Sequence, residues 1–140
     1  NSMNTGREVT AKLAGTGTQT AALNMGTGSD TESYDGTNWT TEANRTIGAA
    51  ADAGSGTQSS AFSFGGFNPA IPGITNSSQN YNGTSWVTGL SLTSARRRLG
   101  GFGPSSTAVA AGGSDGPSTA ATEEFTAEST ALNIKTITTS

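Results

Sequence analysis

The chain has 140 residues, of which 31% are hydrophobic and 12% are charged, with a net charge of −3. Both fractions lie below the roughly 45–50% and about 25% that are usual for globular domains. The low net charge and the frequent threonines nevertheless indicate one β domain that spans residues 1–140, and not a disordered chain. The weak acidity argues against a nucleic-acid partner. The chain has no cysteine and no histidine, which excludes disulfides and the usual general base. No apolar run reaches the roughly 20 residues of a membrane span.

The chain repeats one short phrase, which indicates how it is organised. Tyr34–Trp39 reads YDGTNW, and Tyr81–Trp86, roughly 47 residues later, reads YNGTSW. A period of this length is typical of repeat architectures such as propeller blades, in which each repeat buries its apolar face against its neighbours. We therefore predict three units, at about residues 1–40, 41–88 and 89–140.

The first unit is expected to begin with a strand at Arg7–Leu13. In the following block, Gly15–Gly26, Leu23 and Met25 alternate with small or polar neighbours, as in a strand with one buried face. A glycine-containing loop and a further strand at Thr31–Tyr34 follow this block.

The turn after that strand carries a strong hairpin signal. The Asp-Gly pair at 35–36 and the Asn-Gly pair at 82–83 tolerate the positive φ of a type I′ turn. The strand after each turn carries Trp39 or Trp86. Each unit is therefore expected to form four short antiparallel strands.

The second unit repeats this order with larger side chains. A strand is expected at Ile47–Asp52, ahead of the block Gly54–Gly66. Phe62 and Phe64 take the places of the leucine and the methionine of the first unit. The next strand is expected at Gln79–Tyr81.

The loop Gly65–Ser77 of this unit is long and contains two prolines and several large apolar residues. This composition indicates a preorganised contact surface. We expect partner binding through Phe67, Asn68, Ile71 and Ile74. The alternative is that these side chains pack over the neighbouring unit.

The third unit departs from the pattern. A strand is expected at Ala95–Gly100, and Val109 and Ala111 of the block Gly101–Gly113 align with the two phenylalanines of the second unit. The strand Thr122–Phe125 follows, but the unit has neither the glycine turn nor the tryptophan, as is common in terminal repeats.

Two further segments belong to the third unit. Its last strand is expected at Leu132–Thr138, with Ile134 and Ile137 in the core. Residues 96–98 are three consecutive arginines, which we interpret as the solvated edge of a strand rather than a phosphate site.

Aromatic residues recur in register and are expected to form the repeat core, because they add large buried areas to strands of alanine, serine and glycine. These residues are Tyr34, Trp39, Phe62, Phe64, Tyr81, Trp86 and Phe125. A platform on which sugars stack is the alternative role for the tyrosines and tryptophans. The glycine pairs at 65–66 and 112–113 are expected to allow close approach or sharp turns at strand ends.

This pattern resembles the kelch-type β-propeller repeat, in which a Gly-Gly pair closes the second strand of a four-stranded blade and a Tyr and a Trp follow on the third and fourth strands. The pair at 65–66, Tyr81 and Trp86 match that order, and the pair at 112–113 with Phe125 matches it in part. The first unit lacks the doublet, and the Tyr-to-Trp spacing is shorter than in typical kelch blades.

The sequence motifs are also similar to the degenerate kelch-like repeats of structural and tail-fibre proteins of tailed bacteriophages. Gly17–Leu23 and Glu32–Trp39 fit their phrases, as do Ala121–Phe125 and Lys135–Ser140. This resemblance implies a non-enzymatic structural or adhesion module of a phage virion, in the tail or a fibre, that binds protein or a host-surface glycan. The alternative is a secreted or cell-surface bacterial lectin-like propeller.

Three blades are fewer than the roughly four to eight that close a propeller, so sheet faces would remain exposed at both ends. We expect a second copy, another virion protein or a longer parent chain to complete the ring. The expected location is the virion, with the extracellular space or the bacterial surface as the alternative.

Catalysis has little support in the sequence. The carboxylates form no recognisable acid–base pair, and the neighbours Glu123 and Glu124 are expected to point to opposite faces of a strand. A propeller enzyme such as a glycan lyase or oxidase would need histidine, a Cys–Tyr pair or clustered acids. We expect no catalytic residue, cofactor or metal, with calcium bound by loop carboxylates as the alternative.

Overall fold

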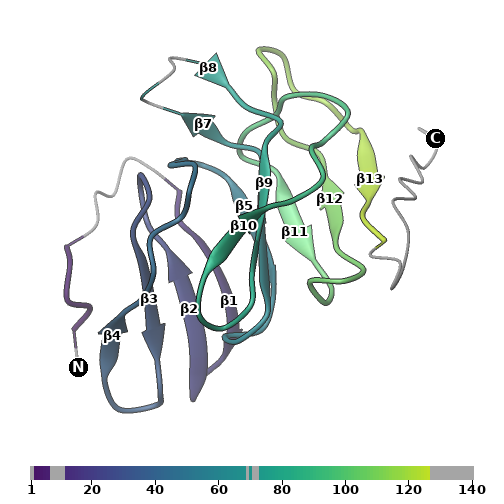
Figure 1. The fold of residues 1–140 in the computed structure, drawn as a ribbon. Helices are drawn as coiled ribbons and strands as arrows, with labels where there is room; N and C mark the ends of the chain where they lie inside the picture. Colours follow the sequence, from purple (N-terminus) through teal and green to yellow (C-terminus); the bar gives the residue numbers. More distant parts are fainter. Residues whose placement is uncertain (1, 7–11, 69, 71–72, 127–140) are drawn as a thin grey trace.

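The computed structural model describes residues 2–6, 12–68, 70 and 73–126. These residues form an all-β arrangement of short antiparallel sheets (Figure 1). No helix occurs among them, and therefore none that could span a membrane.

Three sheets and one hairpin contain all the described strands. Sheet 1 has the order β1 (Ala14–Thr18), β2 (Ala21–Met25), β3 (Thr31–Tyr34) and β4 (Trp39–Thr41). Sheet 2 has the order β10 (Trp86–Thr88), β9 (Ser78–Tyr81), β6 (Ala61–Phe64) and β5 (Ala53–Gly56). Sheet 3 has the order β11 (Gly100–Phe102), β12 (Val109–Ala111) and β13 (Thr122–Glu124). The hairpin, β7 (Phe67–Asn68) with β8 (Gly73–Ile74), is inserted between β6 and β9.

Sheet 2 lies between the other two sheets and shares a core with each of them (Figure 1). The core between sheets 1 and 2 contains Ala14, Leu23, Met25, Ala61, Tyr81 and Trp86. The core between sheets 2 and 3 contains Ala53, Phe62, Phe64, Leu92, Leu99, Ala108 and Ala110, and Phe125 packs against it. Because successive side chains of a strand point to opposite faces, β6 serves both cores.

The strands β3, β9 and β13 confirm the expected third strands to within one residue at each end. The expected first strand at Ile47–Asp52 is wrong, because β5 begins at Ala53. Likewise, the expected first strand at Ala95–Gly100 is wrong, because β11 begins only at Gly100. β1 begins at Ala14, directly after the strand expected at Arg7–Leu13, of which residues 7–11 lie outside the described residues. Each first strand therefore begins one residue before a glycine-rich block and continues into it.

Glycine makes these first strands possible, because they are the ones that approach each other most closely. β5 contacts β1 on one side and β11 on the other. A Cβ atom on Gly101 would lie 2.5 Å from the carbonyl oxygen of Gly54, and a Cβ on Gly54 would overlap the methyl group of Met25. Since glycine is depleted in ordinary strands, the sequence pattern places the first strands too early.

The residues that precede the first strands are joined by the main chain. The Ala51 N–H donates to the Lys12 carbonyl oxygen at 3.0 Å, and the Arg98 N–H donates to the Ala51 carbonyl oxygen at 2.7 Å. Ala51 and Arg98 also share a left-handed backbone, with φ of 56° and 58°. Lys12, Ala51 and Arg98 are thus equivalent positions of the three units, and main-chain hydrogen bonds link them where the three sheets converge.

The hairpin turns are longer than the expected type I′ turn. Gly36 has a φ of 92°, but Asp35 does not adopt a positive φ. Instead, Asp35 Oδ1 accepts hydrogen bonds from the N–H groups of Thr37 and Asn38, at 2.8 and 2.7 Å. Residues 82–85 repeat these contacts with the Asn82 side chain. The side chain closes an Asx turn, which stabilises a four-residue connection.

The glycine pairs act as expected. Gly65, Gly66, Gly112 and Gly113 have φ of 70°, 103°, 66° and 103°. A Cβ on Gly65 would lie 2.6 Å from the Arg96 carbonyl oxygen, so these pairs combine a sharp turn with a close approach.

The third sheet has three strands within the described residues. The expected strand Leu132–Thr138, with Ile134 and Ile137, lies outside them. Within the described residues, the three sheets form an open stack and not a closed ring.

Candidate binding groove and open sheet faces

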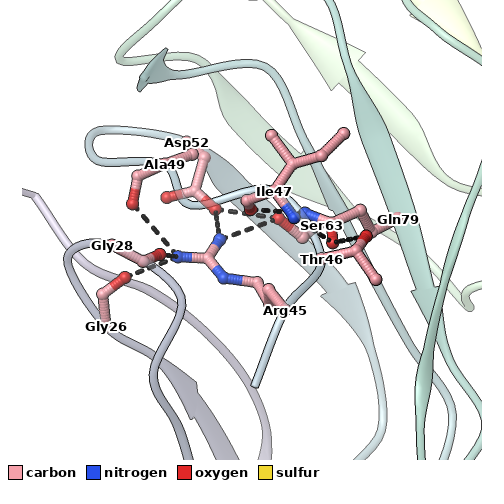
Figure 2. A network of polar contacts seen from close by, with 9 residues as sticks. All are labelled: Gly26, Gly28, Arg45, Thr46, Ile47, Ala49, Asp52, Ser63 and Gln79. Atoms are coloured by element: carbon pink, nitrogen blue, oxygen red, sulfur yellow. Dashed lines mark hydrogen bonds and ion pairs between the residues drawn. The ribbon is translucent and has the colours of Figure 1, made fainter. Parts of the chain in front are cut away.

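Arg45 lies in the connection from sheet 1 to sheet 2 and fixes the loops of both (Figure 2). Its Nη1 atom lies 2.5 Å from Asp52 Oδ2, and both side chains are buried. The other amino group donates to the carbonyl oxygens of Gly26, Gly28 and Ala49. The planar guanidinium therefore binds these four acceptors at once, more than the three N–H donors of a lysine could serve.

A second buried arginine corrects the interpretation of residues 96–98 as a solvated edge. Arg96 is 1% exposed, and its Nη2 lies 2.7 Å from Glu123 Oε1. Its Nη1 donates to the carbonyl oxygens of Gly112 and Ala121, so it closes the loop between β12 and β13. Only Arg98 is exposed as expected.

A polar side chain in each third strand holds the segment that leads into its own unit. Glu32 accepts from the N–H groups of Asn4 and Thr5, at 3.2 and 2.9 Å. Gln79 does the same for Ile47 at 3.0 Å (Figure 2), and Glu123 for Thr93 at 2.7 Å. The sequence did not predict this role, although the three residues occupy equivalent positions in the three units.

The expected contact loop is folded onto the scaffold. Phe67 exchanges main-chain hydrogen bonds with Ala50, at 2.9 and 2.7 Å. Phe67 also pairs with Ile74 across the hairpin, Asn68 is buried, and Ile71 lies outside the described residues. The hairpin brings Phe67, Asn68 and Ile74 together, and their role in partner binding stays a prediction.

A polar groove of about 250 Å³ opens between sheets 1 and 2, beside β3, β9 and the turns that follow them. It is lined by Ser33, Asp35, Glu42, Gln58, Ser59, Tyr81 and Gly83. Glu42 is held at both oxygens: the Ser33 hydroxyl donates at 2.6 Å and the Tyr81 hydroxyl at 3.1 Å. Gln58 donates to the Tyr34 carbonyl oxygen at 2.8 Å.

The groove contains two carboxyl groups with different surroundings. Asp35 is exposed, and the hydrogen bonds from the Asn38 and Thr37 N–H groups hold its pKa below its usual value. Glu42 is partly buried and accepts from Tyr81. Burial and this contact with Glu42 raise the pKa of Tyr81 to about 12, so its hydroxyl remains a donor at neutral pH.

These groups suit a ligand rich in hydroxyl groups, since carboxylates accept and serine and tyrosine hydroxyls both donate and accept. The volume lies just below the roughly 300–1,000 Å³ of typical ligand pockets, which leaves room for about one sugar ring. Within the described part of the chain, no three acidic side chains gather closely enough to hold a metal ion.

The corresponding place between sheets 2 and 3 is different. That cavity measures about 50 Å³, and Phe62, Asn80, Leu90, Ser105, Phe125 and Thr126 line it. Phe125 stands where Tyr81 stands in the first groove, and Ser105 stands where Gln58 stands. The carboxylate and the tyrosine hydroxyl are thus particular to the first groove.

The expected core aromatics fall into two groups. Phe62, Phe64, Tyr81 and Trp86 are buried, and Phe125 packs, partly buried, against Phe62 and Phe64. Tyr34 and Trp39 are only half-buried, because no described sheet covers the face of sheet 1 from which they project. On the opposite end of the stack, Phe102 is 60% exposed.

No protein-family model and no curated protein matches this chain. Among solved structures, that of YjhT has a similar fold, with a TM-score of 0.63 at 19% sequence identity. The match covers 74% of this chain and 34% of YjhT, so the chain spans about a third of that protein's length. This likeness concerns the arrangement of strands alone.

Proposed function

We propose that the chain is a non-enzymatic structural and adhesion module of a phage virion, in the tail or a fibre, built of kelch-like β-propeller blades. The observation that carries the proposal is one antiparallel sheet repeated three times and stacked through equivalent residues. The resemblance of the sequence repeats to kelch-type repeats and to those of phage structural and tail-fibre proteins supports the same assignment. Such a stack is a rigid scaffold that displays loops and grooves, where binding residues concentrate.

We further propose that adhesion uses the groove between the first two sheets and that its ligand is a host-surface glycan. Glu42 is held in place by Ser33 and Tyr81 and can accept hydrogen bonds from sugar hydroxyls. Gln58, on the turn between β5 and β6, also lines this groove.

A glycan array tests this assignment directly. The unmodified chain should bind a defined set of saccharides, and Glu42→Gln and Gln58→Ala should each weaken that binding about 10-fold or more, because one lost polar contact is worth about 1–3 kcal/mol. Ser105→Ala, at the position equivalent to Gln58, is the matched control and should bind normally. Binding unaffected by all three substitutions would exclude the groove as the site.

The same groove is compatible with the alternative, a secreted or cell-surface bacterial lectin-like propeller. Immunogold electron microscopy with an antibody against the chain separates the two assignments. Label on phage tails or fibres supports the virion module, and label on bacterial surfaces supports the lectin.

A further inference from the structure

We propose that a second copy of this chain docks head to tail, with the open face of sheet 1 of each copy packed on the open face of sheet 3 of the other. This deepens the proposed function by naming a partner of the module, and it rests on that function only in treating the chain as part of a ring.

The open face of sheet 1 is built like a face that is buried inside the stack. Tyr34 pairs with Trp39 across β3 and β4, as Tyr81 pairs with Trp86 across β9 and β10. The ring centroids are 5.0 Å apart in both pairs, with interplanar angles of 33° and 34°. The second pair belongs to the core between sheets 1 and 2.

The segment that leads into each sheet is bound in the same way in sheets 1 and 2. Glu32 and Gln79 occupy equivalent positions of β3 and β9, and each binds the main chain of the incoming segment. In sheet 2 that segment leaves Tyr81 and Trp86 free to pack on sheet 1. The corresponding segment of sheet 1 therefore leaves the Tyr34–Trp39 pair available to another sheet.

The open face of sheet 3 carries the opposite half of such an interface. Val109 and Ala111 in β12 stand where Phe62 and Phe64 stand in β6 and where Leu23 and Met25 stand in β2. In the first two sheets these positions face the next sheet and are buried against it. In sheet 3 they are half-buried, and Phe102 beside them is 60% exposed.

The two open faces differ from each other, so the contact is heterologous, and such contacts form rings when the rotation closes. Two copies supply six sheets, which lies within the roughly four to eight of a closed propeller. The main-chain series Lys12, Ala51, Arg98 would continue across the contact, with Lys12 N–H of one copy donating to the Arg98 carbonyl oxygen of the other.

The solution mass tests the proposal. Sedimentation equilibrium over a range of concentrations should give a species of twice the 13.9 kDa of one chain. Trp39→Glu and Phe102→Lys should each reduce it to the mass of a single chain. Val87→Lys, at an exposed position of sheet 2 that is 51% accessible, is the matched control and should leave the pair intact.

Mixing the two monomeric variants distinguishes unlike faces from like faces. An equimolar mixture of Trp39→Glu and Phe102→Lys should recover the doubled mass, because one of the two contacts is then native and both substitutions lie in the other. Recovery supports head-to-tail docking, and failure to recover overturns it. A pair lost only with Trp39→Glu would indicate a symmetric contact of sheet 1 with itself and would also overturn it.

The unmodified chain gives an outcome that does not depend on any variant. A single-chain mass at every concentration, or open polymers that lengthen with concentration, would overturn the closed pair. Glycan binding by the groove is measured separately and would be unaffected, because the groove lies between sheets 1 and 2 of one chain.

Discussion

Trp39 and Trp86 stand at the same position of neighbouring sheets and stack on their tyrosines with the same geometry, yet only Trp86 is buried. Sheet 1 covers Trp86, whereas no described sheet covers Trp39. Equivalent sequence positions thus have different surroundings, because burial depends on the neighbouring repeat.

This difference predicts unequal losses of stability in the Phe102→Lys background, where the proposed contact between copies is removed. Trp86→Ala should cost about 3–5 kcal/mol, as for other large-to-small core substitutions. Trp39→Ala should cost clearly less, because its side chain is already half-exposed. Urea unfolding followed by circular dichroism measures both, and equal losses would contradict the assigned cores.

The buried ion pair of Arg45 with Asp52 predicts strong coupling between the two residues. Arg45→Met alone should cost about 3–5 kcal/mol, because it leaves a carboxylate buried without its partner. Combined with Asp52→Asn, the loss should be smaller than the sum of the two single losses. Additive losses in a double-mutant cycle would mean that the two groups do not interact.

The inner glycines predict a steric effect that depends on position. Gly101→Ala should destabilise by about 1–3 kcal/mol, since its Cβ would meet the carbonyl oxygen of Gly54 at 2.5 Å. Gly6→Ala is the control, because nothing lies within 4 Å of its Cβ position, and it should change stability by about 0.5 kcal/mol at most. Thermal unfolding that does not distinguish the two variants would contradict the close approach of β5 and β11.

The raised pKa of Tyr81 predicts a loss of stability in alkaline solution. Its pKa is about 12 in the folded chain and 10.0 for the unperturbed group. The unfolded state therefore releases the proton first, and stability should fall as the pH rises from about 10 to about 12, by about 2–3 kcal/mol. Tyr81→Phe should remove this part of the pH dependence. An unchanged alkaline profile in that variant would assign the loss to other groups.

Much of the strand pattern could be predicted from the sequence, because the third strands and the aromatic pairs follow simple period-two patterning. The first strands could not, since Gly54 and Gly101 allow close contacts between sheets, although glycine has a low strand propensity.

The candidate groove could not be predicted from the sequence for a related reason. Glu42 follows β4 of sheet 1, whereas Gln58 lies on a turn of sheet 2, and only the stacking of the sheets brings both to the groove beside Tyr81. Arg96 was misread because its burial depends on carbonyl groups of a loop that is distant in sequence. The aromatic core was accessible to sequence reasoning, whereas the polar contacts between repeats required the structure.

The central claim is that three equivalent sheets stack in sequence order, and nuclear Overhauser effects test it most directly. The stack predicts a cross-peak between the Met25 methyl group and the Gly54 α protons, from sheet 1 to sheet 2, and another between the Phe64 ring and the Gly101 α protons, from sheet 2 to sheet 3. Absence of both cross-peaks in a folded sample, or contacts from Met25 to sheet 3 instead, would contradict the account.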